Sequence, residues 1–256
     1  MKEFDYNIVK NPQIFQENRL PAHSDHICYR SLEEALDKSS SLRKSLNGIW
    51  KFHYAKNMGQ AVDGFWEKNY NCDGWDDIHV PAHIQMEGYD RPHYTNTTYP
   101  WEGTEQLVPG EIPQVFQPVA SYVKYFTIPQ EWNGKQICIS FQGVESAFAL
   151  WLNGIYVGYS ETSFDPAEFD LTPYLVDGEN RLAVRVWKWC AGSWCEDQDF
   201  FRFSGIFRDV YLYAVPETHV WDIDMVPTLS DDYGKGNISV HLQTGGNGSV
   251  RVTLYD

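Results

Sequence analysis

The chain has 256 residues, of which 43% are hydrophobic, enough to bury a core in one large domain or in a domain plus part of another. Its formal net charge of −15 argues against nucleic acid and anionic membranes as partners, because binding to phosphates depends on Lys and Arg. The polar N-terminus lacks an apolar signal segment and no apolar run approaches the roughly 20 residues of a membrane span, so we expect a soluble, cytoplasmic protein whose five cysteines are free thiols.

Residues 1–44 are polar and irregular, and they are too poor in apolar side chains to fold alone. We therefore expect an extended N-terminal arm. One short helix is predicted within it, over residues 31–36, because Ser31 is a good N-cap for the helical pattern that follows.

From residue 45 the hydrophobic pattern changes to a period of two, which is typical of strands with one buried face. The predicted strands cover residues 46–54, 122–128, 137–141, 148–152, 155–159, 181–189 and 209–215. Asn153-Gly154 lies between two of them and is a strong hairpin signal. Many short strands with little helical periodicity predict an all-β fold, a jelly-roll β-sandwich over residues 45–216, with no room for a TIM barrel.

Residues 217–256 contain three more strand candidates, at 220–225, 238–243 and 250–255. An immunoglobulin-like sandwich has about seven strands. We therefore expect the first strands of an incomplete immunoglobulin-like domain, which is either loosely ordered or packed on a partner.

The segment 187–208 combines aromatic rings and carboxylates more densely than any other part of the chain. Three acids lie close together in it: Glu196, Asp197 and Asp199. Carboxylates accept paired hydrogen bonds from sugar hydroxyls, and rings cover the apolar face of a sugar. The same composition fits a buried turn in which Arg202 and Arg208 neutralise the acids, so the residues alone leave both interpretations open.

Seven motifs occur in order between residues 11 and 215: NRLPAH (18–23), SLNG (45–48), VPAHIQMEGYD (80–90), YTNTTYP (94–100), LWLNG (150–154), EDQD (196–199) and SGIFRDV (204–210). Together they resemble the N-terminal part of family 2 glycoside hydrolases, specifically the long β-galactosidases of the lactose-operon kind. The resemblance implies a galactose-binding-like jelly roll followed by the opening strands of an immunoglobulin-like domain.

The resemblance also implies a function for the larger enzyme, the retaining hydrolysis of terminal non-reducing β-D-galactosides such as lactose. In the family a TIM barrel with two catalytic glutamates comes next, beyond residue 256. Residues 1–256 hold no counterpart of either glutamate, so we assign no catalytic residue and expect the chain alone to be inactive. Its expected partners are the remaining domains of the same enzyme and, at full length, further copies in a homo-oligomer.

By the family pattern, Asn96 and Asp199 project into the galactose subsite and bind sugar hydroxyls. Asp199 would also share a sodium ion with groups from the barrel, as a hard oxygen ligand suits a hard cation. The structural alternative for Asn96 is a turn residue bound to its own backbone. Glu196 and Asp197 keep the structural role, as partners of the nearby arginines.

The NRLPAH arm resembles the segment whose loss is rescued by complementation in the family, so residues 11–44 are expected to tie subunits or domains together. The family's surface magnesium site draws on acidic or amide side chains, but two of those positions hold Ile8 and Ala191 here. We therefore expect magnesium in the full-length enzyme and assign no ligand for it in this chain.

Two other functions stay open. A stand-alone carbohydrate-binding module would grip sugar with Trp194, Phe200 and Asp199, whereas a purely structural domain would bind no ligand. The arm and the incomplete second domain favour the β-galactosidase portion, because an independent module ends at a domain boundary.

Overall fold

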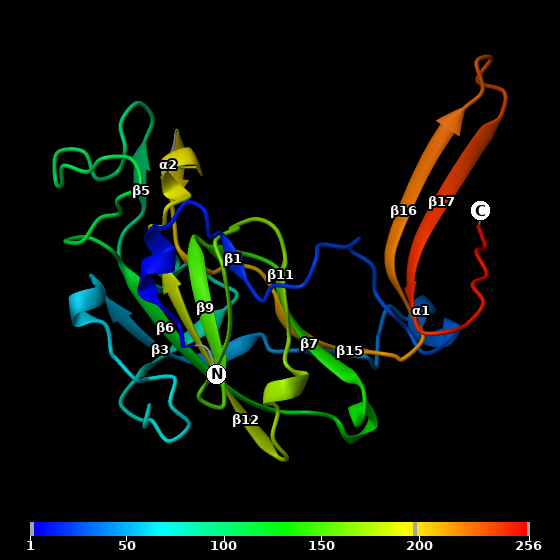
Figure 1. Cartoon of the computed structure of the whole chain (residues 1–256), viewed down its shortest axis with the longest axis horizontal. Helices are drawn as coiled ribbons and strands as arrows, with labels where there is room; N and C mark the ends of the chain where they lie inside the picture. The colour runs from blue at the N-terminus through cyan, green and yellow to red at the C-terminus, as the bar shows by residue number, and fades with distance from the viewer. Residues whose placement is uncertain (1–2, 197–198, 255–256) are drawn as a thin grey trace.

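The fold is a β-sandwich whose two sheets enclose the main apolar core. A computed structural model describes residues 3–196 and 199–254 of the chain (Figure 1). One sheet has seven strands and the other has four. Buried side chains from both sheets meet in one cluster, including Phe52 and Leu150 from the first and Ile139 and Leu212 from the second. The predicted all-β sandwich class is confirmed.

Neighbouring strands are antiparallel in both sheets. The seven-stranded sheet contains, from edge to edge, β1 (Gln16–Glu17), β10 (Ile155–Ser160), β9 (Ala147–Leu152), β12 (Glu179–Trp187), β6 (Val119–Thr127), β3 (Gly48–Ala55) and β4 (Asp76–Val80). The four-stranded sheet contains β11 (Ala167–Asp170), β7 (Gln136–Phe141), β15 (Val210–Val215) and β2 (Arg43–Ser45). Two-stranded sheets pair β13 (Phe200–Arg202) with β5 (His93–Thr95), β14 (Gly205–Ile206) with β8 (Val144–Glu145), and β16 (His219–Leu229) with β17 (Gly236–Gly245).

The strands predicted between residues 46 and 215 are all present, and their ends differ from the prediction by no more than three residues. Asn153 and Gly154 join β9 to β10 with φ values of 53° and 89°, as the predicted hairpin turn requires. The predicted helix is α1 (Leu32–Leu36), whose Glu34 N–H donates to the Ser31 hydroxyl at 3.2 Å.

The remaining helices are short: α2 (Ser193–Glu196) and the 3-10 helices η1 (Tyr6–Lys10), η2 (Met58–Gln60), η3 (Ile84–Glu87), η4 (Gln130–Trp132) and η5 (Thr172–Tyr174). In the described residues, none of the helices has the length and apolar character that crossing a membrane needs. All five cysteines are free thiols, as expected.

A second apolar cluster covers the outer face of the seven-stranded sheet. It joins Trp151 of β9 and Trp187 of β12 to Phe65, which lies in the connection between β3 and β4. The arm adds to this cluster, because Val9 of η1 is fully buried and the Phe4 ring stacks on Trp187 with centroids 5.3 Å apart. The arm is therefore packed on the sandwich by apolar contacts that its polar composition did not predict.

The arm also extends the sheet. Its strand β1 pairs with β10, so two arm residues form one edge of the seven-stranded sheet. Next to β1, the Asn18 side-chain amide donates to the Val157 carbonyl at 2.8 Å, and Leu20 N–H donates to the Glu168 carbonyl at 2.8 Å. The arm thus reaches from one sheet of the sandwich to the other.

The β16–β17 hairpin follows the sandwich, and Figure 1 shows it projecting at one end of the molecule while β5 and α2 lie toward the other end. Both of its strands were predicted, although they extend further than the pattern indicated. The third candidate strand, over 250–255, is wrong for the described residues 250–254, which form no strand. Within the described residues, no strand pairs with the segment that contains Val250 and Val252, so its backbone lacks the hydrogen bonds of a sheet.

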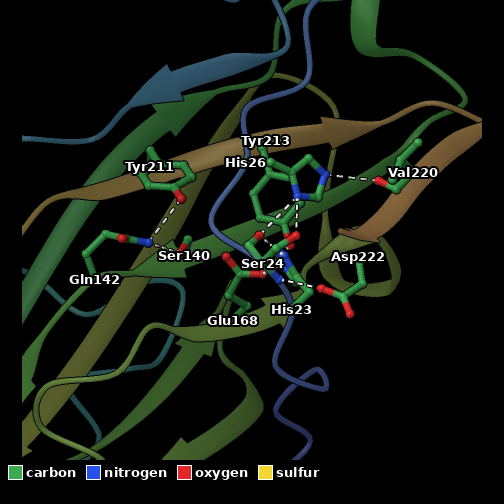
Figure 2. Close-up of polar contacts among 10 residues, drawn as sticks. All are labelled: His23, Ser24, His26, Ser140, Gln142, Glu168, Tyr211, Tyr213, Val220 and Asp222. Atoms are coloured by element: carbon green, nitrogen blue, oxygen red, sulfur yellow. Dashed lines mark hydrogen bonds and ion pairs between the residues drawn. The ribbon is translucent and has the colours of Figure 1, made fainter. Parts of the chain in front are cut away.

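His23 attaches the arm to the four-stranded sheet through a buried carboxylate (Figure 2). Its Nε2 lies 2.8 Å from Oε2 of Glu168 in β11, and the Tyr213 hydroxyl donates to the same oxygen at 2.5 Å. Burial by itself would raise the pKa of Glu168, but the hydrogen bonds from His23 and Tyr213 outweigh it and lower the pKa. The hydrogen bond with Glu168 raises the pKa of His23, so this contact favours the protonated imidazole beside the carboxylate.

The next residues attach the arm to β16 (Figure 2). Ser24 N–H donates to Oδ1 of Asp222 at 2.7 Å. The two ring nitrogens of His26 face carbonyl oxygens, Nδ1 that of Ser24 at 3.0 Å and Nε2 that of Val220 at 3.1 Å. A hydrogen bond with Cys28, together with these carbonyl contacts, raises the pKa of His26 to about 9, and the imidazolium can donate to both carbonyls.

The attachment of the arm to β16 is expected to weaken as pH rises. The folded-state pKa of His26 exceeds its ordinary value of 6.5, so its stabilising effect is complete below pH 6.5 and is lost as pH rises through about 9. Amide hydrogen exchange over residues 18–28, compared with His26→Gln at the same pH, should show stronger protection in the native chain at pH 7 and equal protection at pH 10. His79→Gln, an exposed histidine, is the matched control. Equal exchange of the native chain and His26→Gln at pH 7 would contradict this role.

Candidate functional site

A two-stranded ribbon brings the two predicted ligand residues together. β5 pairs with β13, and Thr95 lies opposite Phe200 in the register. Asn96 follows β5 and Asp199 precedes β13, so the antiparallel register places these two residues across from each other at one end of the ribbon. We call this end the tip of the β5–β13 ribbon.

Asp199 presents its carboxylate at the surface of the tip. The residue is exposed and its φ of 51° lies in the left-handed region, which Asp adopts more readily than most residues. Its Oδ1 accepts a hydrogen bond of 2.6 Å from the Tyr94 hydroxyl, and this contact raises the pKa of Tyr94. Tyr94 therefore stays protonated and holds the carboxylate in place, while solvent and ligand hydroxyls can reach it.

Asn96 is exposed beside this carboxylate. Within residues 3–196 and 199–254 its side chain forms no hydrogen bond, so the contact with its own backbone that a turn residue would make is not present in this part of the chain. Its amide can donate to one hydroxyl and accept from another. Its role in sugar binding stays a prediction.

Exposed rings surround the tip. Tyr94 packs against Phe201 with ring centroids 5.0 Å apart, and Phe164 contacts Phe200 edge to face at 5.9 Å. Phe201 is 56% exposed and Phe200 is 36% exposed. Rings that face solvent beside a carboxylate match the requirements of a ligand with hydroxyl groups around an apolar C–H face.

Trp194 is half-buried and packs on the loop that follows β5. Its Nε1 donates to the Glu111 carbonyl at 2.7 Å, and its ring packs against Tyr99 and Trp101 with centroids 4.7 and 4.9 Å away. The Tyr99 hydroxyl also donates to the Trp194 carbonyl at 3.0 Å. Trp194 therefore holds α2 against the loop that follows β5, and its part in gripping a sugar stays a prediction.

The predicted ion pair of Glu196 is not formed in the described part of the chain, where Glu196 pairs with neither Arg202 nor Arg208. Arg208 instead donates to the Phe164 carbonyl at 2.7 Å. The prediction was wrong because Glu196 ends the α2 turn and its side chain is directed back over that turn. Asp197, for which the same role was predicted, lies outside the described residues.

The family of this chain is established by a sequence match that covers the β-sandwich. Residues 43–216 match the family described as "Glycosyl hydrolases family 2, sugar binding domain", which is well over half of the chain. The chain belongs to glycoside hydrolase family 2. The matched range includes both strands of the ribbon and its tip.

Individual relatives of this family 2 chain agree with that membership. It is similar to a β-galactosidase of Halalkalibacterium halodurans, 53% identical over 92% of this chain and 23% of that protein. A β-galactosidase large subunit of Lactobacillus helveticus is 41% identical over 98% of this chain and 42% of its own length. Among solved structures, a β-glycosidase of Bacteroides vulgatus has a TM-score of 0.60 and 26% identity, covering 80% of this chain and 24% of that one. The chain thus spans less than half the length of each of these relatives.

The magnesium site implied by family 2 does not fit the residues present here. Ile8 and Ala191 are buried and apolar, so neither side chain offers an oxygen to a metal ion. Next to Gly192 lies a carboxyl that the sequence did not single out, Glu161, which accepts a 2.5 Å hydrogen bond from the Tyr159 hydroxyl and whose pKa burial raises to about 7. The described residues contain no cluster of three or more His, Cys, Asp and Glu side chains that could hold a metal.

Proposed function

We propose that this chain is the N-terminal sugar-binding region of a β-galactosidase and that it completes the galactose subsite with Asn96 and Asp199. The observation that carries the proposal is the tip of the β5–β13 ribbon, where these two residues lie across from each other beside exposed rings. Membership of family 2 and the names of the curated relatives support the substrate class, terminal β-D-galactosides of the lactose kind.

The contribution of this chain is binding and orientation rather than bond cleavage. Retaining hydrolysis needs two carboxyl groups about 5–5.5 Å apart around the glycosidic bond, and we assign both to another domain of the enzyme. The Asp199 carboxylate would accept hydrogen bonds from sugar hydroxyls while Tyr94 keeps it oriented. Hydrogen bonds that strengthen as the sugar approaches the transition state raise kcat as well as affinity.

A sodium ion fits the chemistry of this tip. The Asp199 carboxylate, the Tyr94 hydroxyl and the Asn96 amide offer hard oxygen ligands, which suit a hard cation. Only one of the three carries a charge, so further oxygen ligands would come from the domain that holds the rest of the subsite. When bound, sodium would supply a positive charge that fixes a sugar hydroxyl beside Asp199.

The remaining parts of the proposal concern assembly. The other domains of the enzyme would close the subsite against the tip of the ribbon. The arm, which already joins both sheets to β16, would add contacts between domains or subunits of a cytoplasmic homo-oligomer.

The isolated chain is expected to hydrolyse no β-galactoside, because it supplies binding groups alone. A chromogenic β-galactoside assay should give no turnover above that of a control without enzyme, and calorimetry with galactose should give a dissociation constant weaker than about 1 mM, since half of the contacts are missing. Turnover above the control would overturn the assignment. A clear micromolar affinity would instead support the alternative, a stand-alone carbohydrate-binding module, which the exposure of Phe200 beside Asp199 favours.

A further inference from the structure

The β5–β13 ribbon needs an anchor. It forms a sheet of its own with three residues in each strand, and a two-stranded ribbon of this size is not stable by itself in water. Its tip carries Asn96 and Asp199, so any movement of the ribbon moves both side chains. The end opposite the tip, which we call the root, lies where His93 pairs with Arg202.

A buried polar network holds this root. Asp90, which precedes β5, accepts two hydrogen bonds on Oδ2, from Lys188 Nζ at 2.5 Å and from Gln85 Nε2 at 2.9 Å. Gln85 also binds Ser204, which follows β13: its Nε2 donates to the Ser204 hydroxyl at 3.0 Å and its Oε1 accepts from Ser204 N–H at 3.0 Å. One glutamine side chain therefore links the start of β5 to the end of β13.

Lys188 connects the network to the rigid part of the fold. It comes directly after β12, which lies in the middle of the seven-stranded sheet, and its N–H donates to the Pro118 carbonyl at 3.0 Å, just before β6. The side chains of Lys188 and Asp90 are 0% and 2% exposed. The ribbon is thus fastened to two central strands by a fully buried ion pair.

The complete burial of the Lys188–Asp90 ion pair indicates its role in the fold. Moving two charges out of water offsets most of their attraction, so a buried ion pair adds little net stability compared with well-packed apolar side chains. The ion pair instead fixes the relative position of the two segments that it joins, because its hydrogen bonds form only within a narrow range of distances and angles. An ion pair at the root of the ribbon therefore suits control of position better than it suits stabilisation.

We propose that Lys188, Asp90 and Gln85 are positioning residues that hold the root and thereby set where Asn96 and Asp199 meet the sugar. This inference rests on the proposed function, since it assumes that the tip of the ribbon binds the sugar. The three residues act through the backbone of β5 and β13. A displacement of about 1 Å at a substrate-binding group is enough to lower a rate about 100-fold.

The first test uses kinetics of the full-length β-galactosidase that carries this chain. Lys188→Met is expected to lower kcat/KM at least about tenfold, and Lys188→Arg, which keeps the charge, should recover part of the loss. Lys51→Met is the matched control, because it removes an exposed ion pair with Asp77, and it should leave kcat/KM unchanged. The double variant Lys188→Met with Asp90→Leu removes both buried charges; it should fold with a Tm near that of the parent and still show the loss.

The second test measures the ribbon without reference to activity. Amide hydrogen exchange of the 256-residue chain should become faster over residues 90–96 and 200–204 in the double variant, with no change over β6 and β12. Unchanged exchange in the ribbon would overturn the anchoring role. If exchange in the ribbon became faster while kcat/KM of the full-length enzyme stayed unchanged, the anchoring role would be supported. The proposed function of the tip would then be overturned.

Discussion

Replacing Asp199 with asparagine is expected to lower kcat/KM for a β-galactoside about 100-fold in the full-length enzyme. A hydrogen bond to a charged group contributes about 1.5–3 kcal/mol, and 1.36 kcal/mol corresponds to a tenfold change in rate. Asparagine has nearly the same shape and keeps one acceptor oxygen for Tyr94, so the tip should retain its geometry. The loss would therefore report the missing charge rather than a displaced ribbon.

Steady-state kinetics across a series of sodium concentrations is the measurement. The native enzyme should respond to sodium, and Asp199→Asn should respond much less, because the carboxylate that would hold the ion is gone. Asp177→Asn is the matched control, since Asp177 is also exposed but lies in the turn before β12, at the other end of that strand from Lys188. An Asp199→Asn enzyme with native kcat/KM and native sodium response would exclude Asp199 from the subsite.

The sandwich could be predicted because its strands carry a local signal. Trp50 and Phe52 alternate with polar residues in β3, and Asn153-Gly154 marks the turn between β9 and β10. Strands of this kind are defined by a period of two over several residues, so each can be recognised without knowing its neighbours.

The ribbon carries no such signal. β5 and β13 have three residues each, which is too short for a period to be recognised. The resemblance named Asn96 and Asp199, but their juxtaposition depends on a pairing between segments about a hundred residues apart, as the Tyr94–Asp199 hydrogen bond shows. Such a pairing is decided by the tertiary fold and not by local sequence.

The buried charges were also beyond local prediction. In β12, Leu182 and Val184 share one face, and alternation alone places Arg181 and Arg185 on the opposite face, where charged side chains usually meet solvent. Both arginines are instead buried, because the connection between β3 and β4 covers that face of the sheet: Arg181 donates to the Phe65 carbonyl at 2.7 Å. Lys188 and its ion pair with Asp90 are hidden from sequence patterns for the same reason, since a charged residue suggests exposure unless its partner is known.

Gly158→Ala is expected to destabilise the chain by about 3 kcal/mol and to detach β1 from the sandwich. Gly158 lies in β10, where an added Cβ would stand 2.5 Å from Cε1 of the Phe169 ring and 2.6 Å from the Glu17 carbonyl oxygen. Neither neighbour can yield easily, because Phe169 is fully buried and Glu17 belongs to the strand that pairs with β10. Thermal unfolding should show Tm lower by roughly 6–12 °C for a chain of this size.

Gly74→Ala is the control, because a Cβ there meets no atom within 4 Å, and its Tm should stay within about 1–2 °C of the native value. Equal Tm values for the two variants would contradict the close packing at Gly158.

Hydrogen exchange tests the detachment of β1 separately from the loss of stability. A detached β1 exposes the amides of residues 14–18, while the interior strands β9 and β12 stay protected. If the arm leaves first, β10 becomes an open sheet edge, and such an edge invites pairing with another chain. The close approach at Gly158 would then be what keeps the arm seated and this edge closed.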